Sequence, residues 1–149
     1  MIIALGSDHA GFWLKEEIRR HLDHKNIAWI DLGPSKLKTT DDYPDYAKRV
    51  AQFVAKKKDS MGILVCSTGF GMAMAANKVK GIRAANVEST EGARLARRHN
   101  NANIICLGSR FLKQSTSKNI VDVFLREKFD GGARHVRRIT KVRGIERLH

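Results

Sequence analysis

A chain of 149 residues that is 42% hydrophobic and 29% charged has the size and composition of one globular domain, and none of its apolar runs reaches the roughly 18 residues of a membrane span. The opening MIIALGSDHAG lacks the cationic lead and long apolar stretch of a signal peptide, so we expect a cytoplasmic protein with no membrane partner. A net charge of +13 has three possible explanations: binding of nucleic acid, binding of a small anionic substrate, or a solvated lysine-rich surface with no partner.

Apolar runs alternate with helical patterns along the whole chain. Strands are expected at residues 2–6, 27–33, 61–66, 82–87 and 103–108. Helices are expected at 10–24, from Pro44 to about 58, at 70–79, 89–99 and 115–127, and in a basic C-terminal segment. This alternation predicts an α/β, three-layer Rossmann-like fold, with a five-stranded parallel sheet and helices on both faces, in a single domain over 1–149.

The residues that follow each predicted strand are candidates for a site. In parallel α/β sheets, ligands bind beyond the carboxyl ends of the strands. The segments at that edge are Asp8 with His9, the loop 33–45, residues 66–71, residues 88–90, and Ser109 with Arg110.

The segment CSTGFG at 66–71 stands out, because a thiol and two glycines lie between a strand and a helix. Gly69 and Gly71 allow backbone N–H groups to turn outward at the start of a helix, where a pyrophosphate, a phosphate or a reaction oxyanion can bind. A dinucleotide site is disfavoured, because Met74 occupies the sixth position of G-x-G-x-x-G and the turn follows the third strand. The P-loop pattern G-x-x-x-x-G-K-[ST] does not occur.

Cys66 is the candidate for the chemistry at this turn. A thiol beside a helix N-terminus has a lowered pKa, which suits a nucleophile or a general base, although a small buried core residue is the competing interpretation. Asp8, His9 and His99 are expected to converge with it on one edge, although His99 also fits a helix cap. Cys66 and Cys106 have no metal or redox spacing and no H-E-x-x-H occurs, so we expect free thiols in a reducing compartment and no metal.

Six segments carry a resemblance over essentially the whole chain: GSDHAG (6–11), DYPDYA (42–47), CSTGFG (66–71), AANKVKGIRA (75–84), RRHNNANIICLGSR (97–110) and GGARHVRR (131–138). In this order they resemble type B ribose-5-phosphate isomerase, whose superfamily includes the galactose-6-phosphate isomerase subunits. The resemblance implies an intramolecular oxidoreductase that interconverts ribose 5-phosphate and ribulose 5-phosphate through an enediolate, with no metal and no cofactor. It also implies a homodimer or tetramer, in which an arm of about residues 130–149 reaches a partner subunit.

The resemblance also implies catalytic roles. Cys66 stands where the family keeps its base. One branch of the family uses instead a glutamate six positions later, and this chain has Met72 at that position, which cannot accept a proton. Thr68 would relay the proton between the two substrate oxygens. His99 would open the sugar ring, with Asp8 as a helper.

The binding residues complete the implied site. The anion hole for the enediolate is the turn Ser67, Thr68, Gly69, Phe70 and Gly71. The substrate and phosphate contacts are Asp8, His9, Tyr43 in a loop that lines the site, Asn100, Arg110, Arg134 and Arg138. We predict that Cys66 and His99 come from one subunit and that Arg134 and Arg138 come from the other.

Two departures from the family pattern leave the identity of the sugar open. Ser67 replaces the usual glycine, and Ala133 is inserted into the usual GGRH, although Arg134 and Arg138 keep a spacing of four that puts them on one helix face. The alternative substrates are allose 6-phosphate, galactose 6-phosphate or a tetrose phosphate. A basic nucleic-acid-binding module is disfavoured by the 7% aromatic content, and an inactive sugar-phosphate sensor by the presence of both Cys66 and His99.

Overall fold

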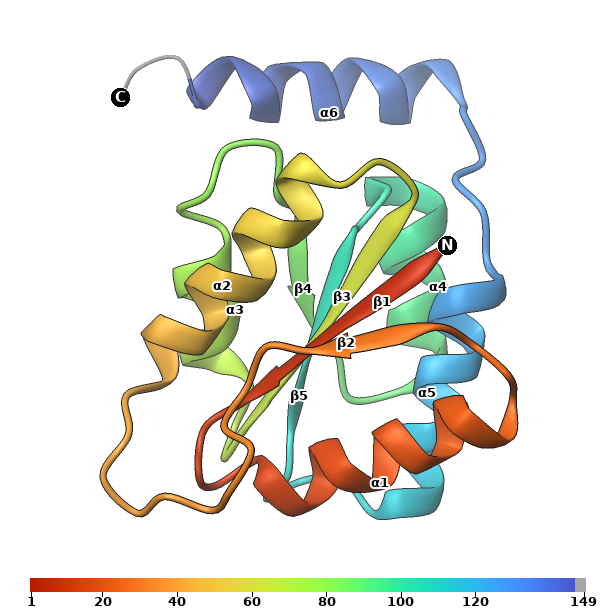
Figure 1. The fold of residues 1–149 in the computed structure, drawn as a ribbon. Coiled ribbons are helices and arrows are strands. Elements are labelled where there is room, and N and C mark those ends of the chain that lie inside the picture. Colours follow the sequence, from red (N-terminus) through yellow and green to blue (C-terminus); the bar gives the residue numbers. More distant parts are fainter. Residues whose placement is uncertain (147–149) are drawn as a thin grey trace.

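Every apolar run predicted as a strand pairs into one parallel sheet of five strands, in the order β2-β1-β3-β5-β4 (Figure 1). This computed structural model describes residues 1–146, so the last three residues of the predicted C-terminal arm lie outside the described residues. The strands are β1 (Ile2–Ser7), β2 (Trp29–Asp31), β3 (Ser60–Cys66), β4 (Ala84–Asn86) and β5 (Ile104–Gly108).

The central strands match their predicted lengths, and the two outer strands are shorter. β2 and β4 each pair with only one neighbour, over three residues, whereas 27–33 and 82–87 were expected to be strands. An outer strand has hydrogen bonds on one side only, so its apolar flanks continue as loops that pack on the sheet without extending the ladder.

Helices cover both faces of the sheet and confirm the three-layer prediction. The helices α1 (Phe12–His24), α4 (Thr90–Asn100) and α5 (Gln114–Arg126) pack on one face, and α2 (Tyr43–Lys56) and α3 (Phe70–Ala76) pack on the other. Alternate strand residues point to opposite layers, so Ile63 and Val65 join the first core and Leu64 and Cys66 the second. Each fully buried Leu or Ile stabilises the fold by roughly 1.5–3 kcal/mol.

The two ends of the sheet are chemically different. We call the end where β1, β3 and β5 finish the carboxyl edge, and the end where they start the amino edge. The sixth helix, α6 (Ala133–Ile145), crosses the amino edge, drawn in blue at the top of Figure 1. It is held there by buried Ile139 and by a hydrogen bond from the Gly81 N–H to Glu146 Oε1 at 3.0 Å.

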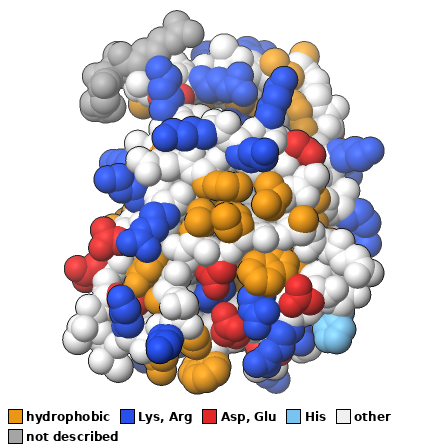
Figure 2. Space-filling model, in the orientation of Figure 1, with side chains coloured by type: hydrophobic (Ala, Val, Ile, Leu, Met, Phe, Trp, Pro, Cys, Tyr) orange, Lys and Arg blue, Asp and Glu red, His pale blue; other side chains and the backbone are white. Residues whose placement is uncertain are grey.

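α6 is a strongly cationic helix. It contains five Arg and Lys residues and no acidic residue: Arg134, Arg137, Arg138, Lys141 and Arg143. On the face shown in Figure 2, blue Lys and Arg side chains gather over α6 and just below it, and hydrophobic side chains form a patch further down. The amino edge is therefore a cationic surface, which favours anionic partners.

Candidate active site

The glycine-rich turn after β3 is built around the Cys66 thiol. Cys66 ends β3 with its side chain buried, and the Gly69 N–H donates to its Sγ at 3.1 Å. Gly69 has φ +83°, and a Cβ there would lie 2.0 Å from Asn86 Oδ1, so only glycine fits. This backbone N–H is placed to stabilise negative charge on sulfur.

The loop after β1 is pressed against the end of β3. A Cβ on Gly11 would lie 2.2 Å from the Val65 carbonyl oxygen, so the two backbones touch there. The Ser109 hydroxyl, at the end of β5, donates to the Ala10 carbonyl at 2.8 Å. These contacts bring the first, third and fifth loops together at the carboxyl edge, as expected for segments that follow parallel strands.

Asp8 lies in this loop as a buried carboxyl group. It is 7% exposed, and its Oδ1 accepts a hydrogen bond from the Gly11 N–H at 3.0 Å. Burial raises the pKa of Asp8, and this effect outweighs the opposing effect of the Gly11 hydrogen bond. A carboxyl group with a raised pKa is suited to exchanging protons.

His9 faces solvent at the same edge and has an acidic partner that the sequence did not suggest. Its ring Nδ1 lies 2.6 Å from Asp41 Oδ1, and its backbone N–H donates to the same oxygen at 3.0 Å. Hydrogen bonding to Asp41 raises the pKa of His9. Asp41 precedes the DYPDYA segment, and the only available signal was the doubled Asp at 41–42.

The remaining predicted residues of this edge surround the turn. The Arg110 N–H donates to the Ser67 carbonyl at 2.9 Å, and the Phe70 N–H points to Thr68 Oγ1 at 3.4 Å. Tyr43 was predicted in a loop, but it is the first residue of α2, and its ring lies against Gly71, where a Cβ would be 2.6 Å from Tyr43 Cζ. These residues rim the Cys66 site.

An exposed aromatic pair lies beside the turn. The rings of Phe70 and Phe111 have centroids 6.3 Å apart, and both side chains are about half exposed. Phe111 follows Arg110 and was not predicted to belong to the site.

His99 does not join this group, which corrects the prediction that it converges with Cys66 on one edge. α4 runs antiparallel to the strands, so its last turn, which holds His99 and Asn100, lies where β5 begins. Asn103, just beyond it, accepts a hydrogen bond from the Gly62 N–H near the start of β3. Gly62 and Cys66 are four residues apart on β3, or about 13 Å. His99 and Cys66 of one protomer therefore lie at opposite edges.

At the amino edge His99 stacks on a histidine of α6. The ring centroids of His99 and His135 are 4.4 Å apart and their planes differ by 7°. His135 is buried, with Asp130 Oδ2 3.6 Å from its Nε2 and Arg134 Nε donating to the same nitrogen at 3.2 Å. Burial lowers the pKa of His135, so the ring is neutral at pH 7. Neither Asp130 nor His135 was predicted to belong to the site.

These three side chains also define a group whose geometry bears on metal binding. The ligand atoms of His99, Asp130 and His135 all lie within 4.8 Å of one another. The two imidazole planes are nearly parallel, so the nitrogen lone pairs, which lie in the ring planes, do not point at one position. Binding of a single ion by both histidines would require one ring to rotate.

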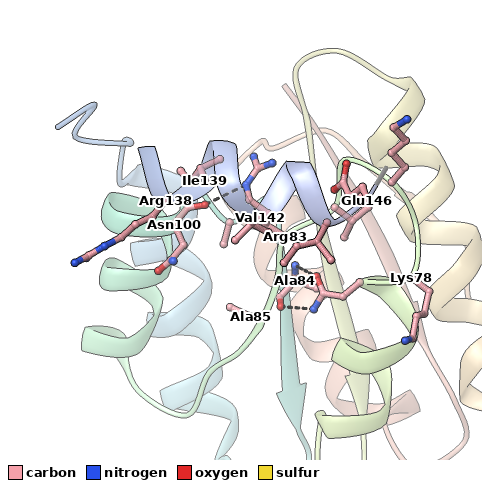
Figure 3. A pocket seen from close by; sticks show the side chains of 14 residues that line it. Lys78, Arg83, Ala84, Ala85, Asn100, Arg138, Ile139, Val142 and Glu146 are labelled. Atoms are coloured by element: carbon pink, nitrogen blue, oxygen red, sulfur yellow. Dashed lines mark hydrogen bonds between the residues drawn. The ribbon is translucent and has the colours of Figure 1, made fainter. Parts of the chain in front are cut away.

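Asn100 and Arg138 line a cavity of about 740 Å³ between α6 and the amino ends of the strands (Figure 3). The backbone carbonyl of Asn100 accepts a hydrogen bond from Arg83 Nε at 3.1 Å, which fixes the end of α4. Arg134 and Arg138 are both exposed and lie one turn apart on α6, as their spacing predicted. His99, Asn100, Arg134 and Arg138 thus form a second group, separate from the Cys66 group.

Residues 3–142 match the family model described as Ribose/Galactose Isomerase. The chain belongs to this family. It is 52% identical over 141 residues to a probable ribose-5-phosphate isomerase B of Mycoplasma genitalium, covering 94% of this chain and 92% of that protein. It is 43% identical over 144 residues to ribose-5-phosphate isomerase B of Escherichia coli, covering 97% and 95% of the two chains.

Solved structures of the family have the same fold. A crystal structure of a ribose 5-phosphate isomerase from Thermotoga maritima superimposes with a TM-score of 0.92 at 48% identity, covering 96% of this chain and 97% of that chain. Ribose-5-phosphate isomerase B of Mycoplasma genitalium with bound ribulose-5-phosphate gives a TM-score of 0.93 at 48% identity, covering 99% and 97%. The resemblance stated from the sequence is confirmed. Among residues 1–146, no helix is both long enough and apolar enough to cross a membrane.

Proposed function

We propose that this isomerase interconverts ribose 5-phosphate and ribulose 5-phosphate, the reaction named in its relatives. The observation that carries the proposal is the buried Cys66 thiol, which accepts a hydrogen bond from the Gly69 N–H and lies at the same edge as Asp8 and His9. A base beside backbone N–H donors is what a proton transfer next to a carbonyl requires.

In this mechanism Cys66 acts as the thiolate and removes the proton from C2 of the open-chain aldose. The electron pair of that C–H bond moves to the C1 oxygen and gives an enediolate, whose negative charge the N–H groups of the 67–71 turn stabilise. Thr68 transfers a proton between the two substrate oxygens. Cys66 then returns its proton to C1, which yields the ketose and restores the thiolate, so no proton or electron is gained or lost.

The two separate groups suggest that the working site is formed by two subunits. We propose that a second copy of this chain places its amino edge against the carboxyl edge of the first. His99 of that copy would open the sugar ring and Asn100 would contact a sugar hydroxyl. Arg134 and Arg138, one turn apart on α6, would bind the phosphate together with His9 and Arg110 of the first copy.

This arrangement also uses the charge of the arm, about residues 130–149. A two-fold homodimer has two identical composite sites, each with cationic groups from α6 over a turn that binds a dianionic substrate. The prediction is thereby revised: His99 acts with Arg134 and Arg138 from the partner instead of with Cys66 from the same chain. We further propose that the enzyme works in a reducing cytoplasm, because both of its cysteines are free and buried.

Subunit exchange tests the composite site. Mixing equal amounts of Cys66→Ala and His99→Ala under exchange conditions makes half of the dimers mixed, and each mixed dimer has one site with both defects and one with neither. Activity should return to about one quarter of wild type. If His99 acts within its own chain, no dimer has an intact site and the mixture stays inactive. A mixture of Cys66→Ala with the Cys66→Ala/His99→Ala double variant is the matched control, and it should stay inactive in either case.

A different sugar phosphate remains the second candidate substrate, and Ser67 is the observation that favours testing it. This residue places a partly buried side chain in the turn where the family pattern has glycine. Turnover of ribose 5-phosphate, allose 6-phosphate, galactose 6-phosphate and a tetrose phosphate by the purified enzyme compares them directly. If one of the other three is turned over with a kcat/KM ten times higher than ribose 5-phosphate, the substrate assignment is wrong.

A further inference from the structure

Asp41 and His9 form a pair whose two members come from different loops of the carboxyl edge. Asp41 Oδ1 accepts from the His9 backbone N–H at 3.0 Å and lies 2.6 Å from the ring Nδ1. The same carboxylate oxygen therefore fixes both the backbone and the ring of His9. This contact is specific enough to set the orientation of the imidazole.

The pair differs from an ordinary surface ion pair in its burial. The Asp41 side chain is 5% exposed and that of His9 is 43% exposed. The second oxygen of Asp41, Oδ2, is buried and makes no well-formed hydrogen bond among the described residues, and the Tyr46 hydroxyl is the polar group near the carboxylate. A buried carboxylate depends strongly on the few polar contacts it has, because its charge is poorly hydrated.

Every titratable group that influences the pair favours a charged imidazole. The hydrogen bond to Asp41 is the largest effect and raises the pKa of His9; desolvation opposes it, the nearby charges of Asp8 and Asp41 add to it, and the net pKa is raised. Burial raises the pKa of Asp41, but the hydrogen bonds from the His9 ring and backbone, together with the nearby Tyr46 hydroxyl, outweigh burial, and the net pKa is lowered. Asp41 is thus ionised at pH 7 and holds a proton on Nδ1 of His9.

We propose that Asp41 is a positioning residue for substrate binding: it fixes the His9 ring with Nδ1 toward the protein, so that Nε2–H of a cationic imidazole is the donor offered to the substrate phosphate. The inference rests on the proposed function, in which His9 binds that phosphate. Tyr46, a buried residue of α2, brings its hydroxyl near the Asp41 carboxylate. The device works like the carboxylate–histidine pairs that fix the tautomer of catalytic and metal-binding histidines.

The test compares Asp41→Asn with Asp45→Asn. The Asp41→Asn substitution retains a side-chain oxygen for the His9 N–H groups but removes the charge, and Asp45 is an exposed acid four residues away in the first turn of α2. The His9 imidazole is titrated by NMR, with its signal assigned by its absence in His9→Asn. We expect Asp41→Asn to lower the midpoint and Asp45→Asn to leave it unchanged.

Kinetics give the second readout. At pH 6, below the ordinary pKa of histidine of about 6.5, His9 is mostly protonated in both enzymes, so KM of Asp41→Asn should lie within about twofold of wild type. At pH 8 KM should be roughly three- to tenfold higher, since each unit of lowered pKa reduces the protonated fraction up to tenfold, while kcat changes less than twofold. Ionisation of the substrate phosphate cancels in the ratio of the two enzymes.

The His9→Asn background separates positioning from a structural role. There Asp41→Asn should leave KM unchanged, because the group it acts through is gone. An unchanged His9 midpoint in Asp41→Asn, an equal KM increase at pH 6 and pH 8, or the same KM loss in the His9→Asn background would each overturn the proposal. If the wild type turns over no sugar phosphate, the proposed function fails, and the His9 midpoint with and without added inorganic phosphate still decides the role of Asp41.

Discussion

A substitution at Gly11, which contacts the end of β3, can measure how strongly catalysis depends on the position of the 8–11 loop. Gly11 has φ −92°, which any residue adopts, so Gly11→Ala adds no backbone strain and its effect is purely steric. The new Cβ would lie 2.2 Å from the Val65 oxygen and 2.4 Å from its carbonyl carbon, where ordinary contact begins at 3.4 Å. Both obstacles are backbone atoms, so the 8–11 loop must move about 1.2 Å away from β3.

That displacement carries Asp8 and His9 away from Cys66. A misplacement of about 1 Å costs on the order of 100-fold in rate, so kcat/KM should fall about 100-fold, and overpacking should lower the free energy of unfolding by about 1–3 kcal/mol. Steady-state kinetics at 25 °C and thermal unfolding measure the two losses. Gly144→Ala is the matched control: Gly144 lies in the last turn of α6 with open space around it, so alanine adds a methyl group without a clash and without moving the loop. Activity of Gly11→Ala within twofold of that control would refute the reasoning.

Two further outcomes follow from the buried groups. Cys66→Ala should lose about 100- to 10,000-fold in kcat, the usual contribution of a positioned base, while Cys106→Ala keeps its activity, because burial raises the pKa of the Cys106 thiol and leaves it inert; equal turnover by the two variants contradicts the assignment. His135→Ala should slow the cyclic substrate about tenfold by leaving His99 without its stacked ring, and His135→Phe, which keeps a flat ring, should retain most of the activity. If the two His135 variants lose equal activity, stacking is not what positions His99.

Much of the fold could be predicted because hydrophobic periodicity determines it. The run 61–66 reads as a strand buried on both faces, and β3 (Ser60–Cys66) lies at the centre of the sheet. Elements at the outside of the sheet were predicted less well, because their ends depend on how many neighbours they have. Tyr43 illustrates a second limit: it begins α2 one residue before the predicted start at Pro44, and its ring packs against Gly71, a contact between distant segments that no local pattern contains.

The shared edge of Asp8, His9 and Cys66 could be predicted because each is a chemically reactive residue that lies at the carboxyl end of a predicted strand. Asp41 was missed because the partner of a loop carboxylate depends on the folded conformation of the loop. The sequence does not show that this partner is His9. His135 was missed for the same reason, since its partner His99 lies on another helix.

The wrong prediction for the position of His99 has a topological cause, which the order of the predicted strands and helices already implied. In a parallel sheet every connecting helix runs back from the carboxyl edge to the amino edge, so a residue in its last turn must lie at the amino edge. His99 and Asn100 end α4 and precede β5, so neither can reach Cys66 of the same protomer through any adjustment of a loop. α6 crosses the same amino edge and brings Arg134 and Arg138 beside them, so the side chains proposed for ring opening and for part of the phosphate site share that edge. The carboxyl edge holds Cys66, the proposed base, together with His9 and Arg110, the other proposed phosphate ligands. If the proposed catalytic groups lie at opposite edges of one sheet, a complete site forms where the carboxyl edge of one copy meets the amino edge of another. A two-fold dimer contains two such sites.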